Sequence, residues 1–443
     1  MSVDQAAFAE FREALKAPAA AFDDGMSDAE RVARASATFT ARLDRRVAVD
    51  LDTCIHCGMC AEACHFYMAT QDERYTPTYK FEPLRRFYKR QVSPLRWLHK
   101  PFIRKLSAGE LREWQELVYE ACTGCGRCDM MCPMGINIST AIGVMREGLA
   151  RAGMVPAELR ALQTEQRDSN SLFGVGSGEL AALAERLRAE GVELPLDKES
   201  AEVLVLTTAV EVRLFPESVK AAARIMNKSG ASWTLSSSAF EAANVGLISG
   251  DRRTRRAAMR RIVDQAKACG VSAVVVPESG HAYQALRWEA ANDLGMELPF
   301  DVFAIAEYTA ELLNDGKLKL KATADPQTVT YHDPCRLGRH GGVFEAPREL
   351  LAEAGHHVRE PEANRRENVC CGGGCGEYTI SHGAALRQKA FDFKRHELDA
   401  TGAQAVVTGC ANCRINFMLG AAESGWDKPI LSLVETVAET LAD

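Results

Sequence analysis

The chain has 443 residues, of which 47 % are hydrophobic and 26 % are charged, a composition typical of a globular protein with roughly two to four domains. Its formal net charge of −7 argues against general nucleic-acid binding, and no stretch approaches the roughly 18 to 20 consecutive apolar residues that cross a bilayer. The first residues lack a basic region followed by an apolar run, so no secretory signal is expected and the predicted location is cytoplasmic.

Fifteen cysteines are many for a protein of a reducing compartment, where they indicate metal binding or redox chemistry more than structural disulfides. Eight form two tight runs, and six lie between Cys335 and Cys413. Cys269 stands alone, as expected of a packed helix residue. This distribution favours metal or redox sites.

Residues 1–48 are predicted to be helical. Phe8, Phe11 and Leu15 recur at roughly helical spacing, and a second amphipathic stretch covers Ala29–Arg45. The segment carries no residue of obvious chemistry, so we expect it to serve only for packing against the rest of the chain.

Residues 49–150 contain two cysteine runs with the same spacing, C-x2-C-x2-C-x3-C. In this ferredoxin-type pattern three cysteines wrap one face of a four-iron cube, and the fourth points to the other cluster. Zinc needs only four ligands, usually in two separated pairs, and does not account for the doubled pattern. The runs therefore predict two cubane [4Fe–4S] clusters. The expected ligand sets are Cys54, Cys57, Cys60 and Cys132 for one cluster, and Cys64, Cys122, Cys125 and Cys128 for the other.

Two histidines accompany the first run. His65 stands where Pro133 stands in the second run, a departure that affects the exit of the chain and removes no ligand. His56 is interpreted either as a neighbour that modulates the cluster potential or as an exposed loop histidine. Glycines at positions 58, 124 and 126 suit backbone that must approach inorganic sulfur closely.

Between the two runs, residues 85–105 hold eight basic and no acidic residues, with aromatic side chains interleaved. One interpretation is a docking surface for a membrane-embedded partner at the cytoplasmic face, where anionic lipid attracts basic segments. The other is a solvated face whose aromatic residues pack on the ferredoxin domain. The residues are Arg85, Arg86, Phe87, Tyr88, Lys89, Arg90, Arg96, Trp97, Lys100, Phe102, Arg104 and Lys105.

Residues 151–200 are predicted to form helices and a linker, and the remaining parts, 201–325 and 326–443, indicate an internal repeat. With a shift of 132 residues, Ala273–Pro277 falls on Ala405–Gly409, and both stretches are strand-like. Each unit alternates short β-rich runs with helical stretches, which favours parallel sheets. The predicted fold class is α/β plus α+β: a helical ferredoxin domain followed by two tandem small α/β units.

Five cysteines of the second unit follow the pattern C-x34-CC-x38-C-x2-C. The carboxyl ends of parallel strands converge at one edge of a sheet, which is the usual place for a ligand site. Adjacent cysteines cannot easily both face one small tetrahedral ion, but they can bridge a larger, irregular cluster. The five candidate ligands are Cys335, Cys370, Cys371, Cys410 and Cys413.

Other residues near these cysteines have less defined roles. Cys375 has no place in the five-cysteine pattern and is either a nearby redox thiol or a buried unligated cysteine. Arg336, Arg339 and His340 follow the first of the five cysteines. They are candidates for steering an anionic thiol substrate or donating a proton, and the alternative is ordinary surface charge.

The pattern, with Cys370-Cys371-Gly372 at its centre, resembles the cysteine-rich CCG domain of heterodisulfide reductases. That family includes iron–sulfur subunits of glycolate and lactate oxidases and of anaerobic glycerol-3-phosphate dehydrogenase. A ferredoxin domain followed by paired CCG units, over about residues 49–443, is similar to the fused catalytic subunit of membrane-bound heterodisulfide reductase. It also resembles the homologous subunit of the membrane complex that serves dissimilatory sulfite reductase. The resemblance implies that the five cysteines bind a noncubane [4Fe–4S] cluster that cleaves a disulfide.

The first unit departs from the CCG pattern, because residues without thiols stand where the five cysteines stand in the second unit. We therefore predict one noncubane cluster instead of two, with the first unit as a scaffold. This arrangement is closer to the sulfite-reductase-associated subunit than to the two-cluster catalytic subunit. The residues at or near the five positions are Val210, Ser238, Ala239, Glu278 and His281.

The leading hypothesis is an oxidoreductase subunit that carries electrons through two cubanes to or from a noncubane site that reduces or forms a disulfide or persulfide-type bond. Expected partners are a disulfide or thiol substrate and a redox protein, such as a membrane-embedded cytochrome or a quinone-reactive subunit that docks on residues 85–105. The chain would then lie at the inner face of the membrane. The alternative is a non-catalytic electron-transfer subunit of a flavin-dependent dehydrogenase that oxidises glycolate, lactate or glycerol 3-phosphate.

Overall fold

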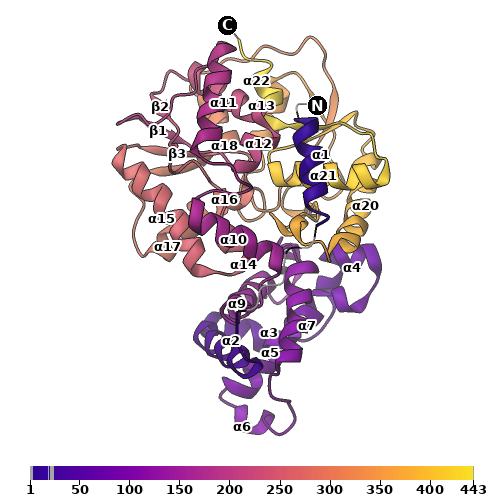
Figure 1. The fold of residues 1–443 in the computed structure, drawn as a ribbon. Coiled ribbons are helices and arrows are strands. Elements are labelled where there is room, and N and C mark those ends of the chain that lie inside the picture. Colours follow the sequence, from indigo (N-terminus) through magenta and orange to yellow (C-terminus); the bar gives the residue numbers. More distant parts are fainter. Residues whose placement is uncertain (1–2, 18, 20–23, 443) are drawn as a thin grey trace.

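The structure is a computed structural model that describes residues 3–17, 19 and 24–442 (Figure 1). Positions 1–2, 18 and 20–23 of the predicted N-terminal helical segment lie outside the described residues, as does position 443 of the last predicted unit. The described chain has a helical lobe, drawn mainly in purple at the bottom of Figure 1, and a lobe with two sheets above it. The first helix, α1 (Gln5–Ala14), lies against the upper lobe.

The helical lobe owes its element boundaries to side chains that cap free backbone N–H groups. Ser27 and Glu30 form a capping box at the start of α2, and Ser107 and Glu110 form one at α7. The helices are α2 (Asp28–Arg42), α3 (Arg45–Thr53), α4 (His65–Thr70), α5 (Pro77–Gln91), α6 (Arg96–His99), α7 (Ala108–Gln115), α8 (Arg127–Met131) and α9 (Ile138–Arg151).

Two four-stranded sheets with the same strand order form the upper lobe. The orders are β2-β1-β3-β4 and β6-β5-β7-β8, and all strand pairs are parallel. The strands that begin at Ala273 and Ala405, which the sequence repeat aligns, occupy the same place in their sheets. The strands are β1 (Val203–Val205), β2 (Trp233–Thr234), β3 (Ala273–Val276), β4 (Asp301–Ala304), β5 (Thr328–His332), β6 (His357–Val358), β7 (Ala405–Thr408) and β8 (Ile430–Ser432).

Helices cover the faces of both sheets because each parallel connection returns through one. One apolar core includes Val205 and Val275 of the first sheet and Val329 and Val407 of the second, so the two units are packed together. The helices are α10 (Ala157–Ser169), α11 (Ser177–Ala189), α12 (Ala209–Leu214), α13 (Pro216–Lys228), α14 (Val245–Ser249), α15 (Arg252–Ala268), α16 (Gly280–Gln284), α17 (Ala290–Leu294), α18 (Ile305–Asn314), α19 (Ala346–Glu353), α20 (Ala384–Ala400), α21 (Ala411–Ser424) and α22 (Leu433–Ala438).

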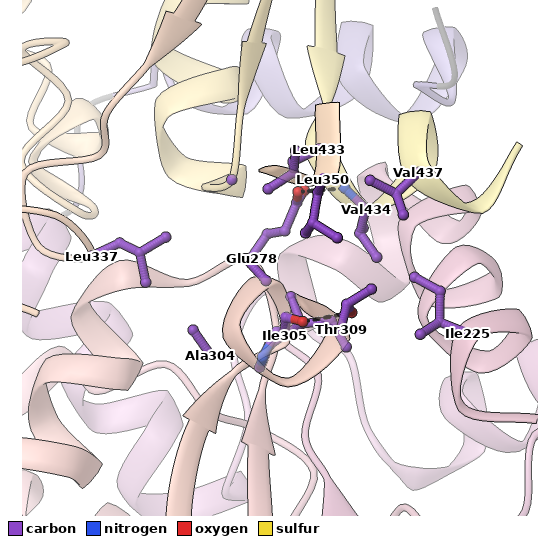
Figure 2. A pocket seen from close by; sticks show the side chains of 13 residues that line it. Ile225, Glu278, Ala304, Ile305, Thr309, Leu337, Leu350, Leu433, Val434 and Val437 are labelled. Atoms are coloured by element: carbon purple, nitrogen blue, oxygen red, sulfur yellow. Dashed lines mark hydrogen bonds between the residues drawn. The ribbon is translucent and has the colours of Figure 1, made fainter. Parts of the chain in front are cut away.

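Glu278 forms a buried polar connection between the two sheets. It follows β3, and its carboxylate accepts hydrogen bonds from Ser432 Oγ at 2.7 Å and from the backbone N–H of Val434 at 2.9 Å. Burial raises the pKa of Glu278 to about 8. Figure 2 shows this side chain beside Leu433 and Val434, at a small apolar cavity of about 10 Å³ between the units.

Arg146 of α9 joins the helical lobe to both sheet-bearing units. Its buried guanidinium donates hydrogen bonds to the carbonyl oxygens of Val118 at 2.9 Å and Ile248 at 3.1 Å, and it pairs with the carboxylate of Glu377. It also donates to the carbonyl oxygen of Cys122 at 2.5 Å. Burial raises the pKa of Glu377 to about 7, and the charge of Arg146 opposes that shift. Segments from three parts of the chain therefore meet at one cation.

We expect Arg146→Ala to lower the free energy of unfolding by about 3–5 kcal/mol, because it leaves the Glu377 carboxylate and several carbonyl groups buried without their donor. Chemical denaturation followed by circular dichroism measures the change. Arg151→Ala, an exposed position on the same helix, is the matched control and should change the value by less than about 0.5 kcal/mol. Equal effects of the two substitutions would contradict the role of Arg146.

Candidate metal centres

Cysteines of both runs surround one cavity in the helical lobe. The structure places Cys64 of the first run beside three cysteines of the second, and the ligand sets themselves stay predictions. Gly124 and Gly126 in the loop have φ values of 59° and 73°, and a Cβ atom would lie 2.7 Å from Arg336 Nη2 at the first and 2.8 Å from His340 Cε1 at the second. The cysteines that line the cavity are Cys64, Cys122, Cys125 and Cys128.

Lys80 is a buried cation beside this cavity that the sequence did not single out. Its Nζ donates a hydrogen bond to Cys64 Sγ at 3.3 Å and lies 5.4 Å from the centre of the Phe66 ring. Burial lowers the pKa of Lys80, but the charges of Cys64 and Cys122 outweigh it, so the net shift is upward. A charged lysine at this point favours negative charge on the surrounding thiolates.

The remaining cysteines of the two runs also lie close together. Burial raises the pKa of Cys60, and the neighbouring Cys54 and Cys132 raise it further, which places the fourth cysteine of the second run beside the first run. Cys57 is exposed. His56 is partly exposed as well, and its Nε2 lies 3.4 Å from a carboxylate oxygen of Glu82. Cys57 is therefore the cysteine of the two runs that solvent and partners reach most easily.

The five cysteines of the CCG pattern converge beyond the carboxyl ends of β5 and β7 and are all buried. Cys335 Sγ lies 4.0 Å from Cys370 Sγ, and the Sγ atoms of Cys371 and Cys413 lie within 4.8 Å of one another and of a nitrogen of His332. A group of five buried thiols fits a cluster with sulfur-bound iron and leaves little room for a hydrated ion.

His332 belongs to the same site, although the sequence did not name it as a functional residue. It is fully buried, packs edge-on against the Phe417 ring, and neither ring nitrogen has a well-formed hydrogen bond among the described residues. Burial lowers its pKa, and the nearby Cys371 thiol opposes this shift. The signal that was present is the sequence His332-Asp333-Pro334-Cys335, which ends at the first of the five cysteines.

The basic residues after Cys335 contact a loop of the ferredoxin domain. Arg339 Nη1 donates to the carbonyl oxygen of Cys125 at 2.8 Å, and His340 Nε2 lies 3.2 Å from that of Gly124. Arg336 Nη2 reaches the carbonyl oxygen of Thr123 at 3.4 Å. These side chains are only partly exposed, and their role as substrate-steering groups stays a prediction, since Arg336 Nε is buried without a hydrogen-bond partner among the described residues. They bind the ferredoxin-domain loop to the CCG cysteines.

His65 lies where the cysteines of the helical lobe and those of the CCG pattern meet. A nitrogen of its ring, Cys125 Sγ and Cys370 Sγ all lie within 4.8 Å of one another. The side chain is 2 % exposed, and its Nε2 has no hydrogen-bond partner in the described part of the chain. Thr123 Oγ1 adds a second contact, 3.5 Å from Cys370 Sγ. His65, which stands where the second run has Pro133, thus contacts both the helical lobe and the CCG site.

The first α/β unit has no thiols at the corresponding places. Glu278 is engaged with α22, and Ser238 Oγ lies 3.1 Å from Ser236 Oγ. Two carboxyl groups that the sequence did not indicate, Glu211 and Glu241, fill the strand ends, and burial raises the pKa of each to about 7. Cys269, predicted to be a packed helix residue, is buried at the end of α15.

Comparisons with known proteins match both regions. A 4Fe–4S dicluster domain matches residues 50–136 and a cysteine-rich domain, CCG, matches residues 329–418. A subunit of the dihydromethanophenazine:CoB–CoM heterodisulfide reductase of Methanosarcina mazei is 29 % identical over 404 residues, covering 89 % of this chain and 94 % of that protein. The Hdr-like menaquinol oxidoreductase iron–sulfur subunit 2 of Archaeoglobus fulgidus is 26 % identical, covering 85 % and 77 %. EtfAB:quinone oxidoreductase of Syntrophomonas wolfei is 28 % identical, covering 82 % and 54 %.

The chain is therefore an iron–sulfur protein with a ferredoxin-type domain and a C-terminal CCG domain. It is a homologue of this heterodisulfide reductase subunit and of the iron–sulfur subunits of Hdr-like menaquinol oxidoreductase, which confirms the resemblance found in the cysteine pattern. Over the residues that the structure describes, no helix combines the length and the apolar character that a membrane span requires.

We expect His65→Phe to retain the iron content of the wild-type protein and to lower the reduction potential of a cluster by roughly 20–60 mV, because the substitution removes a ring N–H near two thiolates. Redox titration followed by electron paramagnetic resonance measures the potentials. His56→Phe, on the exposed loop, is the control and should leave the potentials unchanged. A potential in His65→Phe equal to that of the wild type would count against the bridging position.

Proposed function

We propose that this chain is the catalytic iron–sulfur subunit of an oxidoreductase complex that reduces or forms a disulfide or persulfide-type sulfur bond. The observation that carries the proposal is the contact of Cys125 in the ferredoxin domain with Cys370 of the CCG domain across His65. The exposed group around Cys57 lies at one end of this arrangement and the buried CCG cysteines lie at the other. Such an order suits electron passage between a partner protein and a sulfur site.

The cysteines are assigned to three clusters. The clusters supply one-electron storage and transfer, and the chain supplies thiolate ligands, buried surroundings and the Lys80 and His332 side chains that favour thiolate charge. The assignment is Cys54, Cys57, Cys60 and Cys132 for the first cubane, Cys64, Cys122, Cys125 and Cys128 for the second, and Cys335, Cys370, Cys371, Cys410 and Cys413 for a noncubane [4Fe–4S] cluster.

We further propose that residues 201–325 form a second CCG-type unit without cluster ligands, beside the complete unit at 326–443. The shared strand order of the two sheets supports this proposal. The carboxyl groups at the strand ends of the first unit take part in hydrogen bonds within the protein. The chain then holds one sulfur site, and the first unit supports it.

The reaction at this site consumes two electrons and two protons for each disulfide that becomes two thiols, and the reverse reaction releases them. Electrons come singly from a low-potential carrier protein or leave to an acceptor protein. The chain's own contribution is to hold the second cysteine run against the CCG cysteines through the Arg336, Arg339 and His340 contacts. The five thiols themselves are buried from solvent.

A second candidate function is favoured by the similarity to EtfAB:quinone oxidoreductase. In this alternative the chain is a non-catalytic electron-transfer subunit serving a flavin-dependent dehydrogenase, and the CCG site is a relay that never binds a sulfur substrate. The two candidates share every cysteine ligand and differ only in whether a disulfide reaches the CCG site.

The partner is proposed to be a membrane-embedded redox subunit that docks on part of the basic insertion. Phe87, Tyr88 and Arg90 are buried in the helical lobe, whereas Arg86 of α5 is exposed and the exposed aromatic residues follow α5. There α6 lies at the end of the lobe farthest from the sheets (Figure 1), and Trp97 and Phe102 are 71 % and 85 % exposed. Exposed aromatic side chains among cationic ones are typical of surfaces that meet the membrane interface.

Anaerobically purified protein should contain about twelve irons per chain, as expected for three four-iron clusters. Addition of a disulfide under oxidising conditions should then produce a new paramagnetic species, because the substrate binds at the CCG site. Iron analysis and electron paramagnetic resonance provide both readouts. About eight irons and no new species would refute the sulfur site and leave the relay function.

The double substitution Trp97→Ala with Phe102→Ala should weaken association with membranes that contain the partner by about tenfold or more, because two exposed aromatic anchors are lost. Arg96→Glu with Lys100→Glu should weaken it most at low salt. Co-sedimentation with those membranes is the measurement, and Lys317→Glu, an exposed lysine of the upper lobe, is the control. Unchanged binding of both double variants would rule out this docking surface.

A further inference from the structure

We propose that a cleft between α1, α20 and α21 binds the anionic part of the sulfur substrate. The inference rests on the proposed function, since it adds a recognition site to the CCG cysteines. The cleft has a volume of about 460 Å³, far larger than the apolar cavity of about 10 Å³ between the two sheets. Its lining contains Arg12 and Lys16 from the N-terminal segment and Arg387 from α20.

The charge of the cleft favours an anion. Arg387 is 8 % exposed, its Nη1 has no hydrogen-bond partner in the described chain, and its Nη2 donates to the carbonyl oxygen of Tyr378 at 3.3 Å. Burial lowers the pKa of Arg387 to about 10, so the side chain stays cationic at neutral pH. Arg12 has no ion pair among the described residues and lies half-buried at the end of α1.

Carboxylates near these cations are few or already bound. Glu423 lines the cleft, and Glu13 pairs with Lys16 at 2.8 Å. The charges of three others, Glu120, Glu158 and Glu377, raise the pKa of Arg387 and partly offset the effect of burial, and each bonds another side chain. The partners are His382 for Glu120, Ser381 for Glu158 and Arg146 for Glu377. The cleft thus contains two cations, Arg12 and Arg387, that have no ion pair among the described residues, with Glu423 as the carboxylate of its lining.

The floor of the cleft lies one layer of residues from the CCG site. Asn416 lines the cleft, and its Nδ2 donates to the carbonyl oxygen of Cys371 at 2.6 Å. Gly372 lies on the other side of Asn416, and a Cβ atom there would be 3.6 Å from Asn416 Nδ2 and 3.9 Å from the carbonyl oxygen of Arg387. A substrate whose charge is held at Arg387 therefore has its remaining atoms near the cysteine loop.

Tyr378 lies between the cleft and a smaller inner cavity of about 30 Å³. The inner cavity is lined by Cys375 and by His281, whose buried Nε2 has no hydrogen-bond partner in the described chain. The Tyr378 hydroxyl donates to Asn412 Oδ1 at 3.0 Å, and its ring packs against Phe11 of α1 with ring centres 6.2 Å apart. The helix that supplies Arg12 thus also holds the side chain that separates the cleft from the thiol of Cys375.

The ligand class that fits this arrangement is a small disulfide or thiol that carries carboxylate or other anionic groups. Sequence reasoning offered Arg336, Arg339 and His340 as candidates for such recognition, and the structure shows that each contacts the ferredoxin loop. The three cations of the cleft line it together with Asn416, which bonds the cysteine loop.

The test compares an anionic disulfide, glutathione disulfide, with a neutral one, bis(2-hydroxyethyl) disulfide, using reduced viologen as electron donor and the complete, cluster-loaded chain. Arg12→Gln and Arg387→Gln should each raise KM for glutathione disulfide about tenfold and leave that for the neutral disulfide unchanged, because one charge-assisted contact is lost. Calorimetry of glutathione disulfide binding to the oxidised protein should show the same loss. Lys389→Gln, an exposed position of α20 outside the cleft, is the matched control.

Because Arg387 is buried, its variant is checked for iron content and thermal unfolding, and Arg12→Gln carries the test if Arg387→Gln does not fold. Equal effects on both disulfides, or effects on neither, would overturn the inference. Charge-dependent binding without reduction of either disulfide would contradict the proposed function and still support the cleft. Reduction of both disulfides with unchanged constants in the variants would support the function and refute the cleft.

Discussion

A buried guanidinium needs acceptors for its five N–H groups, and this requirement holds the molecule together at Arg146. Its acceptors lie on the helical lobe at Val118 and Cys122, on the first unit at Ile248 and on the second unit at Glu377. An unpaired buried charge costs several kcal/mol, so these segments cannot separate without a large penalty. The loop that carries the second cysteine run therefore has one position relative to the CCG cysteines.

The loop of the second cysteine run can approach the CCG unit this closely because Gly124 and Gly126 have no side chains. At Gly124 and Gly126 any Cβ atom would meet Arg336 or His340, the side chains that bind the loop. The glycines serve two purposes here, since their positive φ values also let the backbone turn around the cavity that the cysteines of the second run line. Close contact across His65 follows from the absence of these methyl groups and from the hydrogen bonds of the CCG unit to the loop.

The features that could be predicted from the sequence are those that depend on the spacing of nearby cysteines. The runs that start at Cys54 and Cys122 predict a ferredoxin domain, and the doublet at Cys370 predicts a CCG domain. The matches to known domain families confirm both domains, while the ligand sets stay predictions. The roles of His65 and Lys80 could not be read in this way. A histidine in place of a proline, or a lysine near a basic segment, is recognised only when the fold brings a partner such as Cys370 from a distant part of the chain.

The first unit has the strand order of the second and no thiol at the places that align with the five cysteines. The position aligned with Cys410 is Glu278, which bonds Ser432 and the N–H of Val434 across the interface. With its pKa raised to about 8, this carboxyl is largely protonated near neutral pH, so it makes these bonds without an unpaired buried charge. A thiol at this position could not accept both of these hydrogen bonds, and a thiolate bound to a cluster would not be available to accept them. At this position, holding the neighbouring unit and ligating iron are therefore mutually exclusive.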